Sequence, residues 1–72
     1  MAKDQLALRI RAFRKLKGYT QIELAERIGV SVAILGAMER SARHMDELML
    51  RRISVSLDIE YEELIQLKEG EA

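Results

Sequence analysis

Few residue types in this chain could carry out covalent or metal chemistry. The sequence has no cysteine and one histidine, His44, and a lone histidine would need several carboxylates to hold zinc. The chain also offers no pair of a nucleophile and a base, and adjacent acids such as Glu62 and Glu63 are explained by a solvated helix face. We therefore expect a protein that is not an enzyme and that uses no metal ion and no cofactor.

The stretch from Thr20 to Arg40 is the most informative part of the sequence. It predicts a short helix that ends at Gly29 and a second helix that begins directly after Ser31. Glycine can adopt the positive φ that closes a helix, and serine is a good N-cap. The small Ala25 would let the second helix cross the first closely. A helix pair of this kind presents its second helix outward, as docking in the major groove of DNA requires.

Helix-forming residues dominate the whole chain, which has no proline and only four glycines. Near the start, Leu6, Ile10, Phe13 and Lys17 follow a spacing of three and four residues. This spacing predicts a helix over residues 4–17 that stops at Gly18.

Further helix starts share one local pattern. An apolar residue precedes a polar cap, and another apolar residue follows four positions after the cap, as in a hydrophobic staple. The caps are Thr20, Ser31, Asp46 and Glu60. Glu23 can complete a capping box with Thr20, whereas Glu60 is a poor cap. The pattern predicts an all-α protein of five helices in a single domain over residues 1–72, with a core at about 5–67 and a flexible tail at 68–72.

The distribution of charge along the chain and the length of its apolar stretches indicate where the protein acts. Residues 1–44 carry nine Lys and Arg against four acids, a balance of +5, and residues 45–72 carry three against eight, a balance of −5. Such a two-ended domain can orient in the field of DNA, although ordinary solvated helix faces would give the same totals. The longest uncharged apolar stretch, 28–38, is too short to span a bilayer, and the first residues lack the apolar core of a signal peptide. We expect a cytoplasmic protein without a membrane segment.

Several pieces of the sequence, in register, resemble the Cro/repressor-type (XRE) helix-turn-helix domain of the lambda repressor-like proteins. The resemblance covers about residues 6–65. The matching pieces are Leu6-x3-Ile10-Arg11-x-Phe13-Arg14, Gly18-Tyr19-Thr20-Gln21-x2-Leu24-Ala25, Ile28-Gly29-Val30-Ser31, Leu35-x2-Met38-Glu39-Arg40, and Ile53 through Leu64. The resemblance implies a compact five-helix fold and a DNA-binding transcription regulator that docks the helix at 31–41 in the major groove.

The resemblance also implies roles for polar residues outside that helix. Gln21 would meet a phosphate at the start of its helix, where backbone N–H groups favour an anion. Arg14 and Glu39 would form an internal ion pair that ties the first helix to the end of the third. The residues just past the third helix would contact phosphates on the other flank, unless they are ordinary solvated charges; they are Arg40, Arg43 and His44.

The helix that would enter the groove departs from the family pattern. Its DNA-facing residues would be Ser31, Val32, Ala33, Gly36 and Ala37, whereas family members usually carry Arg, Gln, Ser, Thr or Asn at several base-facing positions. Bidentate readout needs such donors and acceptors, although Val32 and Ala33 could touch thymine methyl groups. We expect mostly phosphate contacts and weak direct readout, with DNA shape supplying preference.

Two further partners stay open at this point. The fold could instead serve as a protein-interaction module that uses the apolar strip at 32–37, because an exposed apolar patch often marks a partner site. A homodimer is also compatible with the sequence, since several apolar residues exceed what one core needs: Leu8, Leu16, Tyr61, Ile65 and Leu67. Dimers let two reading helices span successive major grooves.

Overall fold

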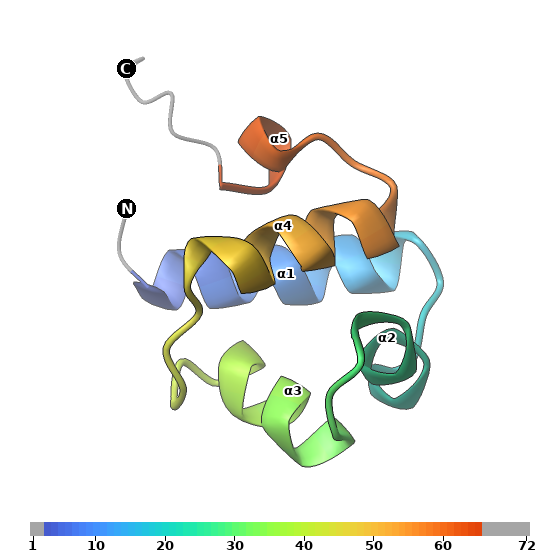
Figure 1. The fold of residues 1–72 in the computed structure, drawn as a ribbon, viewed down its shortest axis with the longest axis vertical. Helices are drawn as coiled ribbons and strands as arrows, with labels where there is room; N and C mark the ends of the chain where they lie inside the picture. The colour runs from blue at the N-terminus through green and yellow to red at the C-terminus, as the bar shows by residue number, and fades with distance from the viewer. Residues whose placement is uncertain (1–2, 66–72) are drawn as a thin grey trace.

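The computed structural model describes residues 3–65, which form α-helices and no strand. The helices are α1 (Lys3–Leu16), α2 (Gln21–Ile28), α3 (Val32–Glu39), α4 (Glu47–Leu57) and α5 (Tyr61–Ile65). Figure 1 shows α1 and α4 running alongside each other, with α5 on one side of them and α2 and α3 on the other. The predicted all-α class is confirmed, while the predicted tail at 68–72 lies outside the described residues.

The helices begin at the residues whose side chains were expected to cap them. Thr20, Ser31 and Asp46 each accept a hydrogen bond from the backbone N–H three residues later, at 3.0, 3.1 and 2.9 Å. The capping box is complete, because Glu23 Oε1 accepts from the Thr20 N–H at 2.8 Å. Glu60, which precedes α5, makes no such bond within the described part of the chain. The apolar residues before these caps pack into or against the core: Tyr19, Val30, Met45 and Ile59.

The first four helices end with the same backbone geometry. A residue with left-handed backbone geometry follows each helix, at Gly18, Gly29, Ser41 and Asp58, with φ of 82°, 78°, 62° and 59°. The next N–H then reaches back five residues to a carbonyl, as from Val30 to Ala25 at 3.0 Å and from Ile59 to Ser54 at 3.0 Å. Glycine marks only two of these four ends. Asp58 belongs to the few residue types whose short polar side chain tolerates this conformation.

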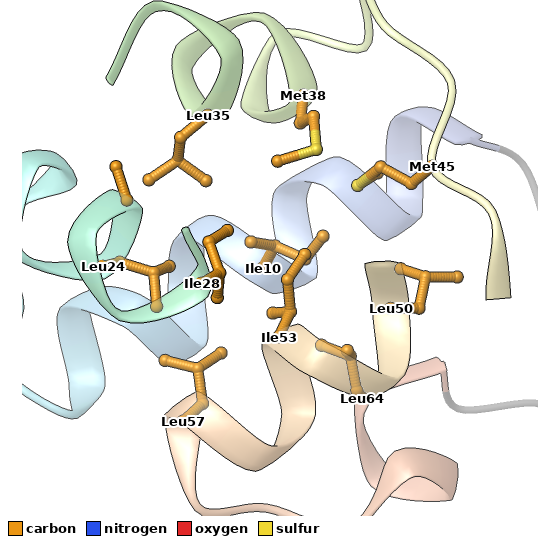
Figure 2. Packing of buried hydrophobic residues seen from close by; sticks show 11 residues of the cluster. Ile10, Leu24, Ile28, Leu35, Met38, Met45, Leu50, Ile53, Leu57 and Leu64 are labelled. Atoms are coloured by element: carbon orange, nitrogen blue, oxygen red, sulfur yellow. The ribbon is translucent and has the colours of Figure 1, made fainter. Parts of the chain in front are cut away.

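Every helix contributes to one apolar core (Figure 2). The large side chains that are less than 2% exposed are Ile10 of α1, Leu24 and Ile28 of α2, Leu35 and Met38 of α3, Ile53 and Leu57 of α4, and Leu64 of α5. On α1 the expected stripe is partly wrong. Ala7, Ile10 and Arg14 are the buried residues, while Lys17 lies past the end of the helix and is exposed.

Arginines connect helix ends to neighbouring helices. Arg9 of α1 donates from Nε to the Leu64 carbonyl at 2.8 Å and from Nη2 to the Glu63 carbonyl. These bonds satisfy carbonyls at the end of α5, where a helix lacks internal donors. Arg52 of α4 reaches the Ile28 carbonyl at the end of α2, at 3.4 Å.

A buried ion pair joins α1 to the end of α3. Arg14 Nε lies 2.8 Å from Glu39 Oε2, and Arg14 Nη2 lies 3.1 Å from Glu39 Oε1. Each residue is only 7% exposed. Arg14 Nη1 also donates to the Tyr19 carbonyl at 2.9 Å, which fixes the connection between α1 and α2. The pair that the family resemblance implies is therefore present, in the two-pronged geometry that arginine favours with carboxylates.

Replacing one partner of this pair should destabilise the protein strongly. We expect Glu39→Ala to lower the free energy of unfolding by about 3 kcal/mol, because it leaves the Arg14 guanidinium buried without its counterion. Urea denaturation followed by circular dichroism measures the change. Glu26→Ala, which removes an exposed carboxylate from α2, is the control and should change stability little. Equal denaturation midpoints for the two variants would contradict the structural role of the pair.

Candidate nucleic-acid interface

The α2–α3 pair is held in a fixed arrangement by the short connection between its helices. Gly29 ends α2, Val30 is half-buried against the core, and Ser31 caps α3. The buried side of α3 carries Leu35 and Met38. On the other side of the helix, Val32 and Ala33 are exposed. The core therefore holds α3 by one side and leaves its first turn open to a partner.

The N-terminus of α2 has backbone N–H groups without an acceptor among the described residues. The Thr20–Glu23 capping box uses the N–H groups of those two residues. Among the described residues, no acceptor pairs with the backbone N–H of Gln21 or Ile22. Two free N–H groups at the positive end of a helix are the arrangement that binds phosphate.

Gln21 is tied to the buried ion pair, which the sequence did not reveal. Its Nε2 donates to Glu39 Oε1 at 3.1 Å, the same oxygen that accepts from Arg14 Nη2. The Glu39 carboxylate thus holds the side chain expected to meet a phosphate. The bond uses one amide N–H of Gln21 and leaves its second N–H and its carbonyl oxygen available to a ligand.

Gly36 lies beneath two long polar side chains. It is a buried residue of α3, and a Cβ placed on it would lie 3.0 Å from Arg40 Nη1 and 3.9 Å from Gln21 Nε2. Gly36, which was expected among the DNA-facing residues, is therefore covered by Arg40 and Gln21. The remaining cationic candidates, Arg43 and His44, are exposed in the segment between α3 and α4.

The apolar strip at 32–37 is mostly turned into the protein. Leu35 and Gly36 are buried, and Ile34 and Ala37 are half-buried. Only Val32, which is 42% exposed, and Ala33 present an open apolar surface. A pair of small exposed side chains is ordinary for a soluble protein, so the structure does not favour the strip as a site for a protein partner.

The described residues contain neither a candidate metal site nor a candidate membrane-spanning helix. Within 3–65, no three His, Asp or Glu side chains come together in a way that could hold a metal ion. No helix in that range combines the length and the apolar character needed to cross a bilayer.

Comparison with known proteins identifies the arrangement. The helix-turn-helix family model matches residues 10–64. The uncharacterized HTH-type transcriptional regulator YazB of Bacillus subtilis (strain 168) is 48% identical over 56 residues, which cover 78% of this chain and 81% of YazB. The HTH-type transcriptional regulator SinR of Bacillus licheniformis is 36% identical over 62 residues, which cover 85% of this chain. The match spans only 56% of SinR.

Solved structures agree with the sequence relatives. The restriction-modification controller protein C.AhdI from Aeromonas hydrophila superposes with a TM-score of 0.82 at 31% identity, covering 86% of this chain and 90% of that one. The clp gene regulator ClgR from Corynebacterium glutamicum superposes with a TM-score of 0.85 at 28% identity, covering 89% of this chain and 82% of that one. With its capped helix pair, its buried Arg14–Glu39 bridge and a family match from Ile10 to Leu64, the chain belongs to the XRE-type helix-turn-helix family.

Proposed function

We propose that this protein is a DNA-binding transcription regulator that docks α3 in the major groove of double-stranded DNA. The observation that carries the proposal is the set of groups around the exposed side of α3. The free N–H groups of α2 and the amide of Gln21 lie on one side, and Arg43 and His44 follow the end of the helix. Relatives that are transcriptional regulators support the same function, and a regulator of this kind acts on DNA in the cytoplasm.

Phosphate contacts supply most of the affinity in this proposal. A phosphate at the start of α2 would accept from the backbone N–H groups of Gln21 and Ile22 and from the Gln21 amide. Arg43 and His44 would contact the backbone on the opposite flank, and Ser31 would lie at the groove entrance with its hydroxyl engaged in capping α3. These contacts set the position of the protein on the duplex and carry no sequence information.

Direct readout by the first turn of α3 is weak in this proposal. Val32 and Ala33 offer only methyl groups, which can contact thymine but cannot discriminate among the other bases by hydrogen bonds. Ala37 is half-buried one turn after Ala33. Small side chains let the helix approach the base edges closely, and the shape of the DNA then contributes to preference.

We further propose that the protein acts as a homodimer. Leu8 and Leu16 are exposed on α1, as expected for a twofold interface, and the structure adds Leu48 and Val55 of α4, at 68% and 79% exposure. Tyr61 and Ile65 instead pack against the core, while Leu67 lies outside the described residues. Two protomers would place two copies of α3 in successive major grooves, about one helical turn apart.

The salt dependence of binding separates charged from uncharged phosphate contacts. We expect Arg43→Ala to weaken binding and to reduce the slope of log K against log salt by about 1, because one fewer counterion is released. Gln21→Ala should weaken binding to every duplex with the slope unchanged, because its side chain is neutral. Fluorescence anisotropy with a labelled duplex at several salt concentrations measures both effects.

The control is Arg51→Ala, which removes the same charge from α4. Arg51 Nε pairs with the Glu47 carboxylate at 2.8 Å on an exposed surface, and its guanidinium lies 4.0 Å from the centre of the Tyr61 ring of α5. The hydrogen bond that Arg51 donates to the Glu47 carboxylate is the main cause that raises the pKa of Arg51. Figure 1 places α5 on the side of α1 and α4 opposite α3, so this variant should retain the salt slope. An equal fall in slope for Arg43→Ala and Arg51→Ala would contradict the proposed orientation.

A new donor on α3 tests whether this helix enters the groove. Ala37→Arg should add a preference for guanine, worth about 1–3 kcal/mol, at a further position of each half-site that the original protein does not discriminate. Selection from a random duplex pool detects it, and a homodimer should show the preference twice, about one helical turn apart. If both proteins select the same sequences, α3 does not dock in the groove.

A further inference from the structure

We infer that Arg40, folded back across Gly36, is the residue through which α3 reads a base. This inference rests on the proposed docking of α3 in the major groove and adds a specificity-determining residue to it. The family resemblance gave Arg40 only a phosphate on the flank, and the first turn of α3 offers no side chain that could make a bidentate bond.

The position of the guanidinium is the first argument. Arg40 follows the last residue of α3 and lies one helical turn after Gly36. Side chains on a helix lean toward its N-terminus, and Arg40 Nη1 comes within 3.0 Å of the point where a Gly36 Cβ would be. The guanidinium therefore lies back along α3, over the helix surface, and not beyond its end.

The glycine itself is the second argument. Gly36 is not among the described residues with positive φ, so its backbone does not require glycine. A glycine inside a helix costs about 1 kcal/mol relative to alanine. What glycine provides here is space: a Cβ would lie 3.0 Å from Arg40 Nη1, so the guanidinium would have to shift by a few tenths of an ångström. Glycine at 36 thus leaves room for the side chain that covers it.

The chemistry available at this point is the third argument. Within the described part of the chain, the side chain of Arg40 makes no hydrogen bond and no ion pair, so all the N–H donors of its guanidinium are free. The Gln21 amide approaches the same point, with Nε2 at 3.9 Å and Oε1 at 4.0 Å, and Glu39 holds that amide in place. A free guanidinium matches the guanine O6/N7 edge, while the adjacent Gln21 amide binds the phosphate that fixes the position of α3 on the duplex.

Two variants that keep the net charge of the protein test the inference. Gly36→Ala retains Arg40 but displaces its guanidinium, and it should raise the melting temperature because alanine favours the helix. Arg40→Lys retains the charge but loses the planar pair of donors. Selection from a random duplex pool should give the original protein a preference for guanine at one position per half-site. Both variants should lose that preference by about tenfold, with the salt slope of binding unchanged.

The outcomes separate this inference from the proposed function. Arg11→Lys, the same change at an exposed arginine of α1, should retain the guanine preference. If Gly36→Ala and Arg40→Lys select the same sequences as the original protein with the same discrimination, Arg40 is a phosphate contact only and the inference is wrong. If the original protein binds no duplex even at low salt, the proposed function fails and the inference fails with it.

Discussion

The rest of the structure depends on the hydrogen bonds that the buried carboxylate of Glu39 accepts. Among the described residues it accepts hydrogen bonds from Arg14 Nε, Arg14 Nη2 and Gln21 Nε2, at 2.8, 3.1 and 3.1 Å. One buried group therefore links α1, α2 and α3. A buried charge is tolerated only when it is paired and its lone pairs are satisfied, so the three helices must keep this arrangement to avoid a large penalty.

The same contact connects stability to the proposed DNA surface. Apolar packing attaches α3 to the core through Leu35 and Met38, but packing alone does not orient polar groups at the surface. Glu39 does so for Gln21, and Gly36 leaves room for Arg40 beside it. A preorganised side chain loses less conformational entropy when it binds. The interior of the protein thus determines how its donors are presented to DNA.

Local features of the fold could be predicted from the sequence because they depend on residues close together along the chain. The Thr20, Ser31 and Asp46 caps and the Gly29 turn follow from backbone chemistry at those positions. The Arg14–Glu39 pair, 25 residues apart, was found only because the family resemblance aligned both residues. Ser41 and Asp58 adopt left-handed geometry without glycine, so no local signal marked them.

The parts that could not be predicted depend on where long side chains lie. Periodicity places Arg9 and Arg40 on a helix face, but it does not say that Arg9 reaches α5 or that Arg40 returns over Gly36. Lys17 fitted the spacing of α1 and was wrongly assigned to its buried stripe. The buried residues there are Ala7, Ile10 and Arg14, because a small side chain and an ion-paired one both fit against neighbouring helices.

A double-mutant cycle tests most directly whether Glu39 positions Gln21 for DNA. Affinity for one duplex would be measured for the original protein, Gln21→Ala, Glu39→Gln and the double variant. Glu39→Gln keeps the shape of the side chain and an oxygen for Arg14, so each protein is first confirmed to be folded at the assay temperature. The account predicts that Gln21→Ala weakens binding less in the Glu39→Gln background, with a coupling energy on the order of 1 kcal/mol. Equal losses in the two backgrounds would show that Glu39 does not organise the DNA-binding surface.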